Sequence, residues 1–222
     1  FARYTCKKKE SLQRINKMAK IKAVIFDLGS VVFDINWKKI NEEMMKKFGI
    51  NVLIRSCGNE KIQKYYDETL VGKREMKEVF NELKTDNVNL DEVVDFYKKL
   101  YKKYKRQNEG ITELIDKLKM KNNLKIFCLT DTNKLHFQAH NEQNSLDEFD
   151  KIFTSFQLGI KKSDKEVFVK VLNEIRINPD ELIFVDDNEK NVNNAQSLGI
   201  NAIKFEDNNQ LIRELKAFKI NM

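Results

Sequence analysis

Oxygen-bearing side chains follow three of the short apolar segments in this 222-residue sequence, at the point where each segment ends. They are Asp27, Thr130, Asp186 and Asp187. Carboxylates that gather at one place repel one another unless a cation neutralises them. An oxygen-rich set of ligands without His or Cys suits Mg²⁺. If the fold brings the three segments together, these residues predict a magnesium site.

The segments that must position these residues are typical of one sheet. Short apolar runs alternate with amphipathic stretches of helical periodicity. The predicted strands are 22–26, 124–129, 151–156, 181–185 and 201–205, and the predicted helices are 111–121, 164–175, 189–199 and 208–218. This alternation indicates an α/β fold, in which a parallel sheet carries helices on both faces. Ligands bind at the carboxyl edge of such sheets, where the polar residues are expected to meet.

A block of helical sequence interrupts this alternation after the first strand. Residues 38–106 show helical periodicity, with no run typical of a strand. Four helices are expected within it, at 41–49, 60–70, 73–84 and 90–105. We therefore predict an all-helical cap at residues 37–106, inserted into an α/β core made of residues 18–36 and 107–222.

Residues 1–17 are basic and lack periodic apolar content, and Met18 resembles a natural start. We predict that this segment is an extension outside the fold, such as a tag, a leader or the remnant of a transit peptide. No apolar run reaches the length of a membrane span. A cytoplasmic location is therefore expected, and the basic extension leaves organellar import open.

The net charge of +7 comes from 41 basic and 34 acidic residues. One interpretation is a nucleic-acid or anionic-membrane partner. The lysines are spread over several amphipathic segments, so we favour a compositional origin and expect neither partner. The cysteines Cys6, Cys57 and Cys128 lack metal-ligand spacing, which predicts free thiols, and Cys128 is expected in the core.

Four segments of the chain, in this order, resemble the motifs of the haloacid dehalogenase (HAD) superfamily of hydrolases. They are FDLGSVVFD, CLTDTN, GIKKSDKEVF and FVDDNEKN. The first motif, DLG followed by DIN, is similar to a subgroup that includes sugar-1-phosphate phosphatases. The resemblance implies a Rossmann-like core, a small helical cap between the first two motifs, and a hydrolase for a small phosphorylated metabolite.

The resemblance also implies roles for the carboxylates. Asp27 would attack a phosphoryl group and form an aspartyl-phosphate; its rival role is a capping residue at a strand end. The Mg²⁺ ligands would be Asp27, the Gly29 carbonyl, Asp187 and Asp186. Asp187 is favoured as a direct ligand, and Asp186 would bind directly or through water.

The same resemblance implies a set of phosphate-binding residues. They are Leu28, Gly29, Thr130, Asp131 and Lys162. Thr130 would hydrogen-bond a phosphoryl oxygen, and its rival role is to cap a helix that begins near Asn133. Lys162 would neutralise phosphoryl charge.

Lys162 is preferred to its neighbour Lys161 for a reason of spacing. It lies six residues before an aromatic residue, Phe168, as the family pattern has it. Where the family usually has Pro after this Lys, the chain has Ser163. Residues 163–166, SDKE, form a capping-box pattern that would start the next helix.

Position 29 departs from the pattern of HAD phosphatases, which usually have a second Asp there. That residue protonates the leaving oxygen and then activates water, and Gly29 can do neither. Loss of such a group typically costs a factor of about 10²–10⁴. Asp34, Asp131 or His136 could replace it, the substrate could carry a good leaving group, or the protein could bind phosphate without turnover.

The sequence thus predicts a Mg²⁺-dependent phosphatase. The alternatives are a metal-independent 2-haloacid dehalogenase, which normally has Tyr at position 29 and lacks the aspartate pair, and a regulatory phosphate-binding module.

His136 and His140 lie four residues apart. A zinc site would need a third ligand, so we expect surface histidines or histidines that contact site residues. Trp37 is expected in the core or along the cleft.

Overall fold

The computed structural model describes residues 19–56, 58–85 and 87–221. The extension predicted for residues 1–17, together with Cys6 and Cys57, lies outside these ranges. Within them, Cys128 is fully buried with a free thiol, as predicted.

Five parallel strands form the central sheet, in the spatial order β5-β4-β1-β6-β7. Their bounds are Ala23–Phe26 (β1), Lys125–Thr130 (β4), Lys151–Thr154 (β5), Leu182–Asp186 (β6) and Asn201–Lys204 (β7). Every residue of β1 is buried, because parallel strands in the middle of a sheet have helices on both faces. The predicted third strand is too long at its end, since Ser155 begins a short helix, α8 (Ser155–Leu158).

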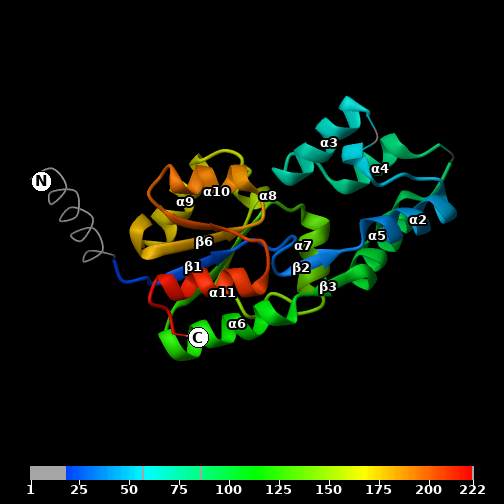
Figure 1. The fold of residues 1–222 in the computed structure, drawn as a ribbon. Helices are drawn as coiled ribbons and strands as arrows, with labels where there is room; N and C mark the ends of the chain where they lie inside the picture. The colour runs from blue at the N-terminus through cyan, green and yellow to red at the C-terminus, as the bar shows by residue number, and fades with distance from the viewer. Residues whose placement is uncertain (1–18, 57, 86, 222) are drawn as a thin grey trace, which may run out of the picture.

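Two pairs of helices cover the sheet (Figure 1). Helices α6 (Glu109–Asn122) and α11 (Asn208–Ala217) lie on one face, and α9 (Glu166–Ile175) and α10 (Glu189–Gln196) lie on the other. Alternate residues of the strands enter two separate cores: Val24 packs with α6 and α11, and Ile25 packs with α9 and α10. The predicted Rossmann-like α/β fold is confirmed.

The insertion after the first strand is a helical cap. Its helices are α2 (Trp37–Phe48), α3 (Glu60–Leu70), α4 (Met76–Leu83) and α5 (Leu90–Tyr104), with a 3₁₀ turn, η1, at Ile54–Ser56. They surround their own hydrophobic cluster, which includes Met44, Phe80 and Leu100. Figure 1 shows the cap as a separate lobe beside the sheet.

The chain enters and leaves the cap through two short strands that the sequence analysis missed. Strands β2 (Phe33–Ile35) and β3 (Lys105–Gln107) pair antiparallel, with Phe33 opposite Gln107. The expectation that residues 38–106 contain no strand is therefore wrong at its end. These segments are three residues long, so the pairing between distant parts of the chain decides their conformation rather than any local pattern.

The cap meets the core where α5 packs against α7 (Lys134–Asn141). His136 and His140 of α7 are 4% and 3% exposed, so a surface position for them is ruled out. Nε2 of His136 lies 2.9 Å from the Tyr97 hydroxyl, and Nε2 of His140 lies 3.0 Å from the Tyr101 hydroxyl. The histidines therefore tie the cap helix α5 to the core.

Acid should destabilise the protein through these buried imidazoles. Burial lowers the pKa of His136 to about 3, whereas an unfolded histidine titrates near pH 6.5. As the pH falls from 6.5 towards 3, the unfolded chain takes up a proton that the folded protein excludes, and folding stability is lost. For His136 alone, we expect a loss of roughly 3 kcal/mol between pH 7 and pH 4.

Thermal melting of wild type and His136→Gln at pH 7 and pH 4 measures this effect. The Gln side chain is able to hydrogen-bond to Tyr97 but does not titrate, so the variant should lose less stability on acidification. The exposed carboxylates contribute equally to both proteins. The same fall in melting temperature in both would contradict the prediction.

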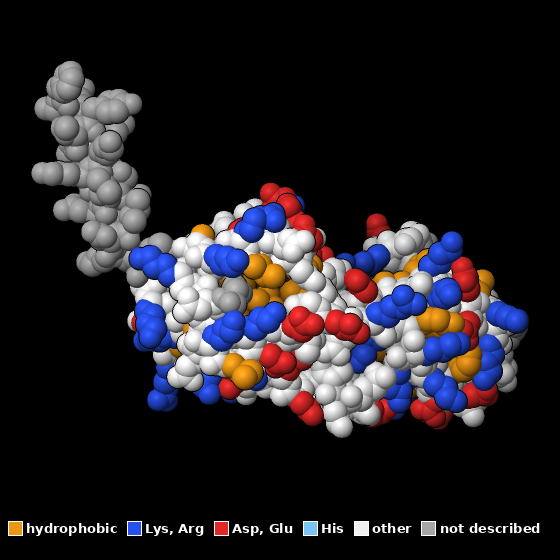
Figure 2. Space-filling model, turned by 60° about the horizontal axis from the view of Figure 1, so that its bottom comes forward, with side chains coloured by type: hydrophobic (Ala, Val, Ile, Leu, Met, Phe, Trp, Pro, Cys, Tyr) orange, Lys and Arg blue, Asp and Glu red, His pale blue; other side chains and the backbone are white. Residues whose placement is uncertain are grey.

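The surface shows no concentration of one charge on the face drawn in Figure 2, where basic and acidic side chains are interspersed over both lobes. None of the described helices combines the length and the apolar composition needed to cross a membrane.

Candidate active site

The polar residues at the strand ends meet at one edge of the sheet. Strand β1 lies between β4 and β6, and Phe26 is level with Cys128 on one side and with Val185 on the other. The next residue of each strand therefore continues to the same edge. The Asp27 amide donates to the Val185 carbonyl at 2.9 Å, which holds the start of the loop against β6.

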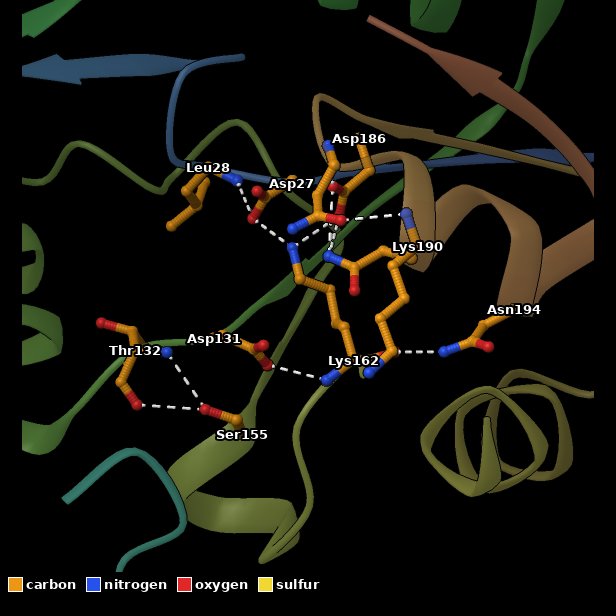
Figure 3. Close-up of polar contacts among 11 residues, drawn as sticks. Asp27, Leu28, Asp131, Thr132, Ser155, Lys162, Asp186, Lys190 and Asn194 are labelled. Carbon is orange, nitrogen blue, oxygen red and sulfur yellow. Dashed lines mark hydrogen bonds and ion pairs between the residues drawn. The ribbon is translucent and has the colours of Figure 1, made fainter. Parts of the chain in front are cut away.

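A buried lysine joins two of the carboxylates (Figure 3). Nζ of Lys162 lies 2.7 Å from Oδ1 of Asp27 and 2.7 Å from Oδ2 of Asp186. Lys162 is 2% exposed and Asp186 is fully buried. Lys161 instead pairs with Asp67 of the cap, at 3.1 Å. The structure thus places Lys162, and not Lys161, beside Asp27.

The electrostatics of this group reflect burial and a shortage of positive charge. Burial raises the pKa of Asp27 to about 7; Lys162 opposes the rise and the charge of Asp186 adds to it. Burial would lower the pKa of Lys162, but the two carboxylates outweigh it and hold that pKa above its ordinary value. Two carboxylates therefore share one ammonium group in a site with little access to water.

A third carboxylate completes a cluster suited to a divalent cation. Oxygen atoms of Asp27, Asp186 and Asp187 lie within 4.8 Å of one another. Burial and the neighbouring Asp186 raise the pKa of Asp187, and the charge of Lys162 and a hydrogen bond from Ser30 oppose that rise. Three carboxylates and one ammonium group leave two negative charges, which a divalent cation would match. Oxygen donors are the ligands that Mg²⁺ prefers.

The carboxylates of Asp186 and Asp187 differ in how many hydrogen bonds and ion pairs they already make. Asp186 accepts hydrogen bonds from the Asn188 amide at 2.8 Å and from Nδ2 of Asn191 at 3.2 Å, in addition to Lys162. Asp187 is exposed. Its carboxylate is therefore more available to a cation than that of Asp186. The side chain of Asn188 caps α10 by accepting from the Lys190 amide.

The other predicted phosphate-binding residues lie at the same edge of the sheet as Asp27. The Leu28 amide donates to Oδ1 of Asp27 at 2.7 Å, and Gly29 follows in the same loop, where it forms a bridge with Phe33. Thr130 ends β4 and is 4% exposed. Thr130 does not cap the next helix, α7. Asn133 is the cap, because its Oδ1 accepts a hydrogen bond from the His136 amide.

The loop that carries Lys162 is held from both sides. Oδ1 of Asp131 accepts from the Lys162 amide at 2.9 Å, and Nδ2 of Asn194 donates to the Lys162 carbonyl at 3.2 Å.

The predicted capping box at residues 163–166 is wrong. Helix α9 begins at Glu166, whose amide donates to Asp164, and Ser163 plays no part in capping it. An aspartate two residues before the helix satisfies the amide instead.

Sequence reasoning missed the side chains that support the site. They are Ser30, Ser155, Asn191 and Asn194. Ser155 accepts from the Thr132 amide at 3.1 Å and so links the loop after β4 to the end of β5. Asn191 and Asn194 are three residues apart on α10 and so lie on one face of that helix. This spacing, directly after the aspartate pair, was the one weak sign in the sequence that they could contact the site.

A cleft of about 450 Å³ lies between the cap and this edge of the sheet. The cap lines it with Ile54, Arg55, Gln63, Tyr66 and Asp67, and the core lines it with Asp131, Lys161, Ser163, Asn188, Lys190 and Asn191. Most of these side chains are charged or carry amides. Trp37 is not among them, and at 38% exposed it is not in the core either, so both expectations for it are wrong. Its ring packs against Tyr101 and His136.

The four motifs that form this site match a known family. A family model for haloacid dehalogenase-like hydrolases matches residues 21–199, which include Asp27, Thr130, Lys162 and the aspartate pair. The chain belongs to the haloacid dehalogenase-like hydrolase family. It is therefore a hydrolase, and the helical cap is an insertion within a HAD core.

Several relatives are similar over most of the chain. A sesquiterpene phosphatase of Aspergillus oryzae is 27% identical over 197 residues, covering 88% of this chain and 95% of the relative. A D-ribitol-5-phosphate phosphatase of Bacteroides thetaiotaomicron is 24% identical over 217 residues, covering 88% and 97%. The chain spans 36% of a drimenol cyclase of Aspergillus calidoustus, to which it is 26% identical.

Solved structures share the fold. A HAD family enzyme of Bacteroides thetaiotaomicron in complex with magnesium and inorganic phosphate has a TM-score of 0.68 at 21% identity, covering 86% of this chain and 98% of that chain. An L-2-haloacid dehalogenase of Xanthobacter autotrophicus has a TM-score of 0.56 at 18% identity, covering 91% and 85%. A dehalogenase and an enzyme that binds magnesium and phosphate thus share this fold, so the fold alone does not identify the reaction.

Proposed function

We propose that this HAD hydrolase is a Mg²⁺-dependent phosphatase for a small, polar phosphorylated metabolite such as a sugar phosphate. The observation that carries the proposal is the juxtaposition of Asp27, Lys162 and the Asp186–Asp187 pair at one sheet edge. The displacement of halide from a haloacid, which is a monoanion, requires no metal. Transfer of a phosphoryl group, which carries more negative charge, is stabilised by a divalent cation and a lysine. The relatives that are phosphatases add support.

Each residue has a step in the proposed reaction. A carboxylate oxygen of Asp27 attacks phosphorus in line with the leaving oxygen, and the ester bond breaks as the aspartyl-phosphate forms. The ammonium group of Lys162 and the hydroxyl of Thr130 stabilise the phosphoryl oxygens. Water then attacks the phosphorus, releases inorganic phosphate and regenerates Asp27.

Asp27, Asp187, Asp186 and the Gly29 carbonyl would hold Mg²⁺. When bound there, the cation would supply charge neutralisation for the phosphoryl oxygens. The negative charge that Lys162 leaves unmatched makes this set of oxygens suitable for a divalent cation.

The lining of the cleft supports a polar substrate. The cap contributes Arg55 and Gln63 to the cleft and the core contributes Lys190 and Asn191. Among the described lining residues, only Ile54 and Tyr66 offer sizeable apolar surface. Such side chains match hydroxyl groups and negative charge, and a long hydrocarbon chain would leave them desolvated without partners. We therefore favour polyol or sugar phosphates over terpenyl phosphates.

Removal of metal tests the proposal. Phosphate release from a panel of sugar, polyol and prenyl phosphates and p-nitrophenyl phosphate should be at least ten-fold lower in EDTA than in Mg²⁺, with full recovery after Mg²⁺ is restored. Activity that EDTA leaves unchanged would overturn the metal-dependent function. Chloride release from 2-chloropropionate would instead indicate the dehalogenase, and phosphate binding without turnover would indicate the regulatory module.

A further inference from the structure

Position 29 leaves an open space where HAD phosphatases of the usual pattern would carry their acid. A side-chain Cβ built at Gly29 would meet no atom of the described residues within 4 Å, and the φ of Gly29 is not in the left-handed region. Neither packing nor backbone conformation therefore requires glycine here. The proposed reaction, on which this inference rests, still needs a group that protonates the leaving oxygen.

Two of the three candidate groups are poorly placed for that role. Asp34 is exposed on β2 and lies opposite Arg106 of β3. His136 is buried in the contact between cap and core, and both of its ring nitrogens are engaged, by Tyr97 at 2.9 Å and by Asn133 at 3.3 Å. Neither residue lines the cleft.

Asp131 lies at the boundary between the catalytic group and the cleft. It follows Thr130 directly and lines the cleft together with Ser163 and Asn191. One of its oxygens accepts from the Lys162 amide at 2.9 Å, which orients the carboxyl group (Figure 3). Its other oxygen has no hydrogen-bond partner among the described residues and is free to face a substrate.

The surroundings of Asp131 suit a group that gains and loses a proton. It is half-buried, and burial raises its pKa against the opposing charge of Lys162. A general acid works best when its pKa is brought towards the working pH.

We propose that Asp131 is the catalytic acid and base of this hydrolase, in place of the carboxylate missing at Gly29. As the bond between Asp27 and phosphorus forms and the ester bond breaks, the proton of Asp131 passes to the leaving oxygen, which departs as an alcohol. The Asp131 carboxylate then takes a proton from water as that water attacks phosphorus. Inorganic phosphate leaves, Asp27 is released as a carboxylate, and Asp131 is again protonated.

The leaving group provides the test. Asp131→Asn should lower kcat for a polyol phosphate by about 10²–10⁴-fold. With p-nitrophenyl phosphate, whose leaving group needs no proton, the variant should release a burst of about one nitrophenolate per enzyme, followed by slow turnover as the aspartyl-phosphate accumulates. A merely structural role would not produce this burst.

A second substitution makes the test specific. An aspartate at position 29 fits the open space. Adding Gly29→Asp to Asp131→Asn should therefore raise the activity of that variant on the polyol phosphate at least ten-fold. Asp147→Asn, which changes an exposed aspartate remote from the cleft lining, should match wild type. If Asp131→Asn fails to fold, Asp131→Ser takes its place.

Full activity of the Asp131 variant on the polyol phosphate would overturn the assignment, as would equal losses on both substrates without a burst or a failure of Gly29→Asp to restore activity. Wild type and Asp27→Asn are assayed first on p-nitrophenyl phosphate. Without turnover that depends on Asp27, the proposed function itself fails; with it, these outcomes bear on Asp131 alone.

Discussion

Replacing Asp27 by Asn should abolish phosphate release almost completely, with a loss on the order of 10⁴-fold or more, the scale seen when a covalent nucleophile is removed. The amide has nearly the shape of the carboxylate but lacks the charge and nucleophilicity of its oxygen. The measurement is kcat for phosphate release in Mg²⁺, with Asp34→Asn, an exposed aspartate seven residues away, as the matched control.

Folding should survive this substitution. The pKa of Asp27 is raised by burial, which means that the folded protein disfavours its charged form. Removing that charge should therefore leave the melting temperature unchanged or raise it. A variant that keeps more than a hundredth of wild-type activity, or one that loses activity only because it unfolds, would contradict a nucleophilic role for Asp27.

Replacing Lys162 by Met should damage both activity and stability. Loss of one charged group that stabilises the transferring phosphoryl group typically lowers the rate by about 10²–10³-fold. In addition, the carboxylates of Asp27 and Asp186 would lose the cation that lies 2.7 Å from each. Breaking a buried ion pair by removing one partner costs about 3–5 kcal/mol, which lowers the melting temperature of a protein of this size by roughly 10 °C.

Lys170→Met is the matched control, because Lys170 is exposed on the helix that follows the Lys162 loop. Melting temperature and kcat are measured for both variants. If Lys162→Met melts at the same temperature as wild type, the ion pairs contribute little to stability. If it has the kcat of wild type, Lys162 does not contact the phosphoryl group during the reaction. The two predictions together separate the proposed roles: Asp27 would serve chemistry alone, and Lys162 would serve both chemistry and folding.

Much of the α/β core could be predicted from sequence, because strands buried on both faces are apolar runs and helices are periodic. β1, β4, β6 and β7 appear within a residue of their predicted ends. The strands β2 and β3 could not be found, since each has three residues and its partner lies about 70 positions away in the chain. Long-range pairing of such short segments leaves no local signal.

The site shows the same division. Asp27, Thr130 and Asp186 were visible because each ends an apolar strand and the sheet brings those ends together. The burial of His136 and His140 was not, since their partners Tyr97 and Tyr101 come from the cap. Nor could the sequence show that Asp131, rather than Asp34, lies along the cleft, because that depends on how β2 leaves the core.

The pairing of β2 with β3 has a consequence for how such a protein can change over evolution. The insertion begins and ends on two neighbouring strands, so its two attachment points lie only about 5 Å apart. Helical modules of other lengths could be exchanged at this junction without altering the sheet. The residues that we propose for the reaction all lie outside the insertion, whereas Arg55, Gln63 and Tyr66 of the cleft lining lie within it. The proposed reacting groups and the cap's share of the cleft are thus encoded in separate stretches of one gene.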